Sequence, residues 1–330
     1  MRRGLGLLLC AQLLLCVPTI FAQHQSGKLE RVKFLGRDYV RLRDWASANN
    51  FKLNWLQKDH EIELSNQAFK LVFTADSRLA KINDINVWLS FPIAIRQGVC
   101  YIGLLDLETL VEPIVFPRRN GGRRSIRVIA LDPGHGGKDT GICNGAYQEK
   151  KYTLLLAQEV REQLKQAGLT ALLTRTTDSL VGLTARSELA RRRGADLFVS
   201  LHFNGTDIAK TQVKGVEVYC LTPAGANSTN ARNISNGVAP AQGNHFDGRN
   251  ALLAFLMQES LVKNLGAEDR GMRRARFEVL REAAMPAILI EGGFLSHPVE
   301  GRKIVDPAYR RQMAQSIVKG LLAYKWLVEQ

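Results

Sequence analysis

The sequence predicts an α/β protein in which a small, strand-rich α+β domain precedes a larger domain with a mostly parallel sheet. Two observations predict it. Residues 29–115 contain segments in which apolar and polar residues nearly alternate, such as RVKFLGRDYVRL and EIELSNQAFKLVF, and this alternation is typical of half-buried strands. Beyond residue 127, short apolar strands alternate with helical patterns, which indicates a largely parallel sheet. A chain of 330 residues is long enough for both cores.

The element pattern sets the expected boundaries. We expect the small domain at 28–116, a polar and basic linker at 117–126, and the larger domain at 127–328. In the larger domain, residues 224–248 are polar and lack a pattern, so a long loop is expected there. The apolar patterns predict strands at 128–131, 170–175, 196–202, 215–222 and 287–294, and helices at 152–166, 183–193, 250–265 and 307–326.

The first 22 residues have the features of a secretory signal peptide. Arg2 and Arg3 form a short basic start, and a mostly apolar run over 5–21 leads to a small residue suited to cleavage. The alternative, a membrane anchor, is disfavoured because the run is short and contains Pro18. No later stretch reaches the about 20 apolar residues that a spanning helix needs. We therefore expect an exported protein, periplasmic or associated with the cell envelope, with no stable membrane span after cleavage.

Charge limits the class of partner. The formal net charge is +14, and it falls to +12 once Arg2 and Arg3 are removed (14 − 2). A basic balance suits nucleic acid, anionic lipid or an acidic polymer. Export argues against nucleic acid, and so does the lack of interleaved aromatic residues in the arginine clusters near 191–193 and 273–276. An anionic envelope polymer fits better, with a basic surface that only keeps the protein soluble as the other interpretation.

Three expected strands lead into residues that can bind a metal or transfer a proton. His135 follows VIALDPG, His202 ends LFVSLH, and Glu291 directly follows AILI. Ligands of open α/β sheets bind at the carboxyl ends of the strands, so these side chains should meet at one edge. A buried carboxylate needs a partner, and an ion pair between Glu291 and Arg175 is the alternative structural explanation.

These residue types favour metal chemistry. Two histidines and a carboxylate are a sufficient ligand set for a catalytic zinc ion, which keeps three protein ligands and an open position for water. Glu149, just before the helix at 152–166, offers a second carboxylate besides Glu291. The glycines around His135 would allow a tight turn and leave space beside a metal. Neither a phosphate-binding glycine motif nor a G-x-S-x-G serine motif occurs in the sequence.

Residues 127–324 resemble the catalytic domain of zinc-dependent N-acetylmuramoyl-L-alanine amidases, the amidase-3 family of bacterial cell-wall hydrolases. The matching stretches occur in the family's order and are DPGHGGKDTG, QEKKYTLLLA, LLTRTTD, LTARSELA, ADLFVSLHFN, GVEVY and MPAILIEGGFLSHPVE. The resemblance implies a mostly parallel mixed sheet flanked by helices on both faces. It also implies that His135, Glu149 and His202 bind Zn²⁺ and that Glu291 is the catalytic carboxylate.

The resemblance further implies an activity. The bond cut would be the amide between the lactyl group of N-acetylmuramic acid and L-alanine in peptidoglycan, for cell-wall turnover or cell separation. The implied partner is peptidoglycan, and whether an activator protein takes part stays open. Two alternatives remain: a peptidoglycan-binding module with an inactive site, and a zinc peptidase that cuts elsewhere in the stem peptide. The four intact site residues argue against the inactive module.

Some residues depart from the family pattern or compete with the expected site. KDTG, EGGF and SHP replace more usual sequences, and His297 in the last of these is interpreted as incidental. Cys143 lies between two proposed ligands and is a competing but disfavoured zinc ligand. His245, in the polar loop at 224–248, is expected to be exposed. That loop is too short and too polar to resemble the inserted helix that blocks the zinc in some family members.

Residues 28–116 resemble a second family, the copper amine oxidase N-terminal-like domain. An internal repeat, YVRLRD at 39–44 and YIGLLD at 101–106, leads twice from a strand into a short helix. No copper site is expected, because His60 is the only histidine of the region. The composition changes at the linker, so we expect this domain to fold separately and to be dispensable for the chemistry.

Overall fold

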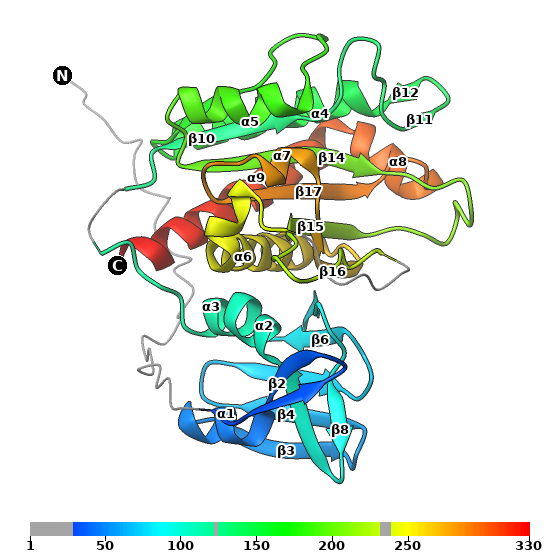
Figure 1. Ribbon diagram of the computed structural model, residues 1–330. Helices are drawn as coiled ribbons and strands as arrows, with labels where there is room; N and C mark the ends of the chain where they lie inside the picture. The colour runs from blue at the N-terminus through cyan, green and yellow to red at the C-terminus, as the bar shows by residue number, and fades with distance from the viewer. Residues whose placement is uncertain (1–28, 122–124, 232–238) are drawn as a thin grey trace, which may run out of the picture.

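The computed structural model describes residues 29–121, 125–231 and 239–330, so the expected signal peptide at 1–22 lies outside the described residues. Figure 1 shows a smaller N-terminal unit, coloured blue to cyan, and a larger unit, coloured green to red. No helix in the described part of the chain combines the length and the apolar composition needed to cross a membrane.

The smaller unit is built mainly of strands, as the alternating pattern predicts. In β4 and β5 every second residue is buried, for example Ile62 and Leu64, then Leu71 and Phe73. The two copies of the internal repeat lie side by side, since β2 and β9 pair in antiparallel fashion. Its elements are β1 (Arg31–Phe34), β2 (Arg37–Arg41), α1 (Leu42–Ala48), β3 (Lys52–Gln57), β4 (Glu61–Ser65), β5 (Lys70–Thr74), β6 (Leu79–Ile82), β7 (Ile85–Trp88), β8 (Ala94–Arg96), β9 (Val99–Gly103), α2 (Leu104–Asp106), η1 (Leu107–Val111) and α3 (Glu112–Val115).

The larger unit alternates strands and helices. The strands and helices expected from the sequence are present within a few residues of their expected bounds. The additional elements are β11, β12, η2, β16, α7 and α8. The elements are β10 (Val128–Pro133), β11 (Cys143–Asn144), β12 (Tyr147–Gln148), α4 (Glu149–Gln166), β13 (Thr170–Leu173), α5 (Leu183–Arg192), β14 (Leu197–Asn204), β15 (Val216–Leu221), η2 (Gln242–Phe246), α6 (Asp247–Leu265), β16 (Asp269–Ala275), α7 (Glu278–Arg281), β17 (Ala287–Phe294), α8 (Pro298–Val305) and α9 (Pro307–Glu329).

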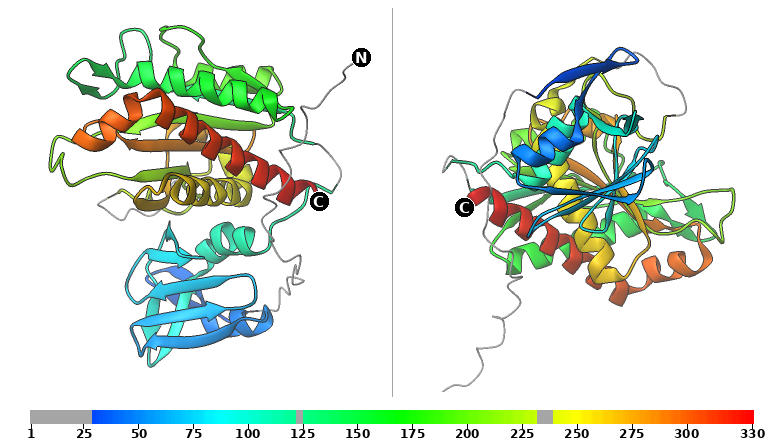
Figure 2. Two further views of the ribbon diagram at one scale, coloured as in Figure 1. Left: turned by 180° about the vertical axis from the view of Figure 1, so that it is seen from behind. Right: turned by 90° about the horizontal axis from the view of Figure 1, so that it is seen from below.

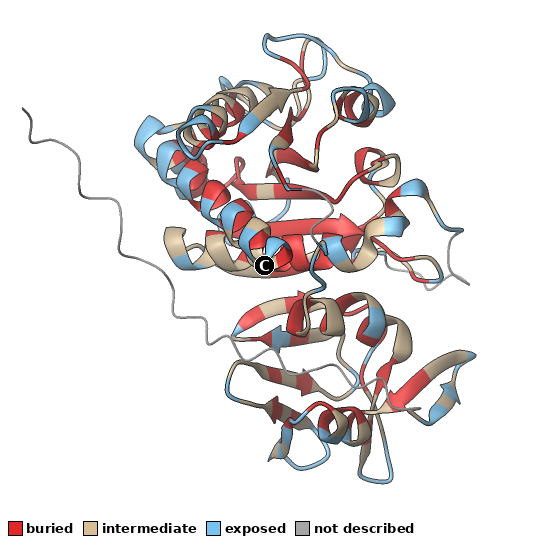
Figure 3. Ribbon diagram, turned by 90° about the vertical axis from the view of Figure 1, so that its left-hand side faces the viewer, coloured by how far each residue is buried: buried red, intermediate tan, exposed pale blue. Residues whose placement is uncertain are grey.

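The sheet of this unit is mostly parallel and mixed. Its strands lie in the order β13-β10-β14-β17-β15-β16, and β15 runs antiparallel to β17. Helices α4, α9 and α6 pack against one another over one face of the sheet, which Figure 2 shows from behind, while α5 and α7 cover the other face. Figure 3 shows strands that are buried and helices whose outer sides are exposed. The expected fold class is therefore confirmed.

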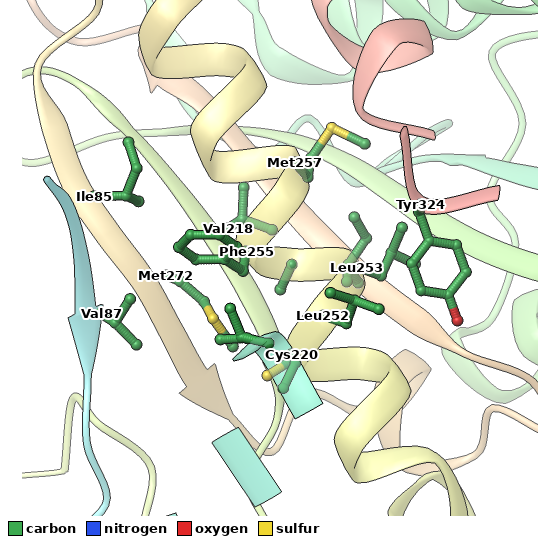
Figure 4. Close-up of a cluster of buried hydrophobic side chains, with 14 of the residues drawn as sticks. Ile85, Val87, Val218, Cys220, Leu252, Leu253, Phe255, Met257, Met272 and Tyr324 are labelled. Atoms are coloured by element: carbon green, nitrogen blue, oxygen red, sulfur yellow. The ribbon is translucent and has the colours of Figure 1, made fainter. Parts of the chain in front are cut away.

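The two units share one sheet. Strand β7 of the smaller unit pairs in parallel with β16 of the larger one, where Val87 lies beside Met272, so the sheet continues through eleven strands. The side chain of Asn86 donates a hydrogen bond to the Asp269 carbonyl oxygen at 2.9 Å. One hydrophobic cluster also spans the junction, and Figure 4 shows Val87 close to Met272 and to Phe255 of α6.

A buried ion pair joins the units as well. Arg274 of β16 contacts Asp106 of the smaller unit at 3.0 Å, and the two side chains are 2% and 0% exposed. Arg274 also donates hydrogen bonds to Ser90 Oγ and to the Thr109 carbonyl oxygen, both at 2.9 Å. Removing residues 28–116 would leave this guanidinium and one edge of β16 without partners. Against the expectation that the smaller unit is dispensable, which stays a prediction, we infer from this junction that it supports the larger unit.

We expect Arg274→Met to destabilise the whole chain. Removing one partner of a buried ion pair leaves an uncompensated charge, here on Asp106, at a cost of about 3–5 kcal/mol. Urea denaturation followed by tryptophan fluorescence and by circular dichroism would measure the loss. The control is Arg191→Met, because Arg191 pairs with Glu188 on the surface of α5 and such exposed pairs contribute little to stability. A larger unit that unfolds at an unchanged midpoint would contradict the supporting role.

Candidate metal centre and catalytic groove

Three of the predicted site residues meet at the carboxyl end of the sheet. His135 follows β10, Glu149 is the first residue of α4, and His202 lies near the end of β14. Each offers one ligand atom, and these atoms all lie within 4.8 Å of one another. The imidazole rings of the two histidines stand edge to face, with centroids 4.8 Å apart. The structure therefore brings His135 and His202 to one edge, as the strand pattern predicts, and adds Glu149, which the family resemblance implied as a ligand.

Glu149 is the centre of this arrangement. Its Oε1 accepts a hydrogen bond from the Phe203 amide at 3.0 Å and lies 2.9 Å from His202 Nδ1. Its Oε2 accepts from the Ile142 amide at 2.9 Å and lies 3.1 Å from His135 Nε2. Burial alone would raise the pKa of this carboxyl, but the contacts with the two histidines outweigh burial and lower it. A charged carboxylate is thus held rigidly between two imidazoles.

The orientation of His135 is fixed by Asp139, which the sequence analysis did not single out. His135 Nδ1 lies 2.9 Å from Asp139 Oδ2, so a proton on Nδ1 would be donated to this carboxylate and leave the lone pair of Nε2 directed at the Glu149 side. A carboxylate behind a histidine in this way selects the tautomer that binds metals. Burial lowers the pKa of His135, but Glu149 and Asp139 outweigh it and raise the pKa.

Close packing explains the glycines around His135. A Cβ atom on Gly134 would lie 2.2 Å from His202 Cε1, and one on Gly141 would lie 2.5 Å from Glu149 Oε2. His135 itself has φ +61°, a left-handed conformation that is uncommon outside glycine. Gly134 and Gly141 therefore carry no side chain because the side chains of His202 and Glu149 occupy the space.

A buried polar network holds this loop from below. Asp132 accepts hydrogen bonds from Arg186 at 2.8 Å and from Ser200 at 2.7 Å. Arg175 donates to the carbonyl oxygens of Pro133 at 3.0 Å and Gly134 at 2.8 Å. Charged side chains that satisfy buried backbone carbonyls in this way fix the turn that presents His135. Sequence reasoning missed Asp132 and Arg186, although a charged residue inside an apolar strand is the signal that could have found Asp132.

Glu291 lies on β17, next to the three proposed ligand residues. The strand register sets it directly next to His202 on β14 and opposite Glu217 on β15. Its Oε2 is buried and has no hydrogen-bond partner among the described residues. Burial raises the pKa of the Glu291 carboxyl well above its usual range, and the charges of Glu149 and Glu217 raise it further. The alternative ion pair is wrong, because Arg175 bonds to the loop carbonyls instead of Glu291.

A cavity of about 790 Å³ opens over these residues. His135, Glu149, His202 and Glu291 all line it, so the ligand atoms and the unpartnered carboxylate face one space. The other walls are largely apolar, with residues from the loop before α5 and from α7. The cavity-lining residues outside the ligand set include Ile142, Leu180, Val181, Leu183, Phe203 and Val279.

The remaining candidates lie outside the ligand group. Cys143 is exposed, unbridged and in contact with Thr140, so it does not join the three ligands. His245 is exposed, as expected. His297 is buried and caps α8, since its Nδ1 accepts from two backbone amides; it has a structural role and not the incidental one expected. In the loop expected at 224–248, the described residues include the short helix η2, and 232–238 lie outside the described residues.

Fold and site together define an α/β protein with a His–Glu–His centre of the metalloenzyme type at the carboxyl ends of its strands. Comparison with known proteins narrows the class. The family model for N-acetylmuramoyl-L-alanine amidase matches residues 129–323, and that for the copper amine oxidase N-terminal domain matches residues 30–111. The chain therefore belongs to the N-acetylmuramoyl-L-alanine amidase family.

Individual relatives agree with this assignment. The chain is 34% identical to the N-acetylmuramoyl-L-alanine amidase AmiA of Salmonella typhimurium over 61% of its own length and 76% of the relative. It is 36% identical to the amidase AmiC of Neisseria meningitidis over 66% of its length and 57% of that protein. Among solved structures, AmiC2 of Nostoc punctiforme matches with 33% identity and a TM-score of 0.51, covering 60% of this chain and 96% of that one.

Proposed function

We propose that this enzyme hydrolyses the amide bond between N-acetylmuramic acid and L-alanine of peptidoglycan with one Zn²⁺ bound by His135, Glu149 and His202. Amidase activity on peptidoglycan follows from the family, and the identity of the metal and the role of each residue are the proposed part. The single observation that supports the proposal most strongly is the convergence of two imidazole nitrogens and a buried carboxylate on the wall of one cavity.

The donor set fits Zn²⁺. Histidine nitrogens and carboxylate oxygens are zinc ligands, and three of them with one open side are typical of catalytic zinc sites. The ligand atoms of His135 and His202 lie 3.1 Å and 2.9 Å from the Glu149 oxygens, and the open side faces the cavity. A bound zinc ion would lower the pKa of a coordinated water toward neutrality and polarise the scissile carbonyl group.

The chain itself would move the proton. The Glu291 carboxylate would accept a proton from the attacking water and deliver it to the amine of L-alanine as the C–N bond breaks, which leaves the lactyl carboxylate and a free amino group. Burial and the neighbouring carboxylates raise its proton affinity, which suits a group that must take a proton and then release it. Asp139 and Glu149 would hold the imidazoles in place during this exchange.

Site of action and specificity form part of the same proposal. A chain with an expected signal peptide and an expected mature charge of +12 suits the anionic cell envelope. Cell-wall turnover or cell separation is the corresponding role. Mass spectrometry of digested peptidoglycan tests the bond: intact stem peptides with a free L-alanine amino terminus are expected. Shortened stem peptides would instead identify a zinc peptidase, and undigested material from zinc-loaded protein would identify an inactive binding module.

The contact behind His135 gives a test that leaves all three ligands in place. We expect Asp139→Ala to weaken zinc binding by about 10- to 100-fold, because the imidazole loses the partner that fixes its tautomer. Competition with a chelating dye would measure the affinity. Asp207→Ala is the matched control, since Asp207 is 99% exposed and pairs only with Lys210 among the described residues. Equal zinc affinity in both variants would show that Asp139 does not orient His135.

A further inference from the structure

A second cavity adjoins the catalytic groove and is not used by the mechanism above. It has a volume of about 420 Å³ and shares Asn204, Phe277 and Glu291 with the main cavity. A substrate whose scissile bond lies at Glu291 can therefore extend into it. Whereas apolar residues line much of the main cavity, charged and polar side chains dominate the second one: Glu217, Tyr219, Asn230, Arg270 and Arg273.

Two arginines of β16 provide the positive charge of this cavity. Arg270 Nε lies 2.5 Å from Glu217 Oε1, and Arg273 Nε lies 3.1 Å from Glu217 Oε2. Glu217 is 3% exposed and cancels one of the two charges, so the group as a whole carries a net positive charge. Arg273 Nη1 also donates to Asn230 Oδ1 at 2.9 Å.

The guanidinium groups of Arg270 and Arg273 still have N–H donors with which to bind a ligand. A guanidinium group has five N–H donors, and Glu217 engages only the Nε of Arg270. The side chains of Arg270 and Arg273 are 27% and 13% exposed, so they are largely desolvated yet still reach the cavity. Charge-assisted hydrogen bonds to a carboxylate are strongest under such conditions.

The smaller unit holds both arginines in position. The guanidinium carbon of Arg273 lies 4.5 Å from the centroid of the Trp88 ring. Trp88 Nε1 donates a hydrogen bond to the Arg270 carbonyl oxygen at 3.1 Å. On the other side, the Arg270 guanidinium lies 4.9 Å from the centroid of Phe294, at the end of β17. Planar stacking of this kind pre-organises arginine for carboxylate binding.

We propose that Arg270 and Arg273 form a subsite that binds a free carboxylate of the stem peptide. The inference rests on the proposed function, because it places the amide to be cut beside Glu291. The two sides of that amide differ in chemistry: the N-acetylated sugar side is neutral near the bond, whereas the peptide side carries free carboxylates. A cavity that holds two fixed guanidinium groups, of which Glu217 neutralises only one, therefore receives the peptide side.

The test compares two substrates that differ only in charge: N-acetylmuramoyl-pentapeptide and the same compound with every peptide carboxylate amidated. The wild-type enzyme should prefer the free carboxylate in kcat/KM by about 10- to 100-fold, as expected for charge-assisted hydrogen bonds. Arg270→Gln should lose most of this preference, mainly through a higher KM for the compound with free carboxylates. Arg191→Gln, a surface arginine of α5 paired with Glu188, is the control.

The comparison separates binding from stability, because a variant that folds less well loses activity on both substrates alike. Equal losses on both compounds, or a wild type without preference, would overturn the subsite while the amidase activity stands. Cleavage of neither compound by zinc-loaded wild type would overturn the proposed function together with the subsite. Trp88→Ala should reduce the preference without loss of zinc, and Trp88→Phe, which keeps an aromatic face for Arg273, should restore part of it.

Discussion

Replacing Glu291 by Gln is expected to lower turnover by about 10²- to 10⁴-fold, because an amide of the same shape cannot act as a general base. The protein should stay folded and keep its zinc. Glu291 is not among the three residues whose ligand atoms converge, so metal content should not change. Zinc content, melting temperature and turnover measured on one sample would check the expectation.

The structure also predicts the sign of the stability change. The Glu291 pKa is raised by burial and by the charges of Glu149 and Glu217, so a charged carboxylate at this position destabilises the metal-free fold at neutral pH. Gln removes that charge, and the melting temperature of the metal-free variant should equal or exceed that of the metal-free wild type. Glu282→Gln is a control that should leave turnover unchanged, because Glu282 follows α7, is half-buried and lies 3.9 Å from Arg281. Near-normal turnover in a folded, zinc-loaded E291Q variant would remove Glu291 from the mechanism.

The part of this site that the sequence predicts is the part that lies at the ends of apolar strands. His135, His202 and Glu291 each follow an apolar strand, and parallel strands bring their carboxyl ends to one edge, so the meeting of these three is predictable. Asp139 was not predicted, because its contact with His135 depends on a left-handed residue in a tight loop. The clash that excludes a side chain at Gly134 involves His202, a residue distant in sequence, and no local pattern contains it.

The least predictable part of the fold is the junction between the units. Strand β16 has the sequence DRGMRRA, whose arginines look like a solvated charged segment and not like a strand. Here the arginines are accommodated by ion pairs with residues far away in sequence: Asp106 pairs with Arg274, and Glu217 contacts both Arg270 and Arg273. Charges that are compensated only by tertiary contacts leave no periodic apolar signal. Because β16 has no apolar pattern, nothing in the sequence indicates that the two units are joined by it.

If the proposed subsite binds the stem peptide, the junction gives the smaller unit a part in substrate binding. Trp88 lies in β7 of that unit, yet it contacts Arg273 and bonds to Arg270 in the catalytic unit. Residues 30–111 match a family described by its place in copper amine oxidases, but the described part of this segment has His60 as its only histidine, and His60 is exposed. We therefore expect this unit to contribute to the enzyme by holding β16 in position and not by binding a metal.

Replacing His202 by Ala is expected to remove both zinc and activity. Only His135 and Glu149 would remain as ligands, and Glu149 Oε1 would keep the Phe203 amide as its sole partner among the described residues. Loss of an outer partner such as Asp139 lowers metal affinity by about 10- to 100-fold, so loss of a direct ligand should exceed that range. Elemental analysis of protein produced with ample zinc should give far less than one ion per chain, with turnover near that of metal-free enzyme.

His245→Ala is the matched control for this variant, because His245 is exposed and bonds to the Gln242 carbonyl oxygen away from the ligand group. It should keep both zinc and turnover. The wild type and the H202A variant together distinguish the metal centre from a hydrogen-bonded charge cluster. In a cluster without metal, losing one imidazole would raise the Glu149 pKa and reduce stability, and added zinc would stabilise neither protein. In a zinc enzyme, stability of the wild type rises with added zinc and that of H202A does not. A variant that still binds zinc tightly and turns over would refute the ligand set.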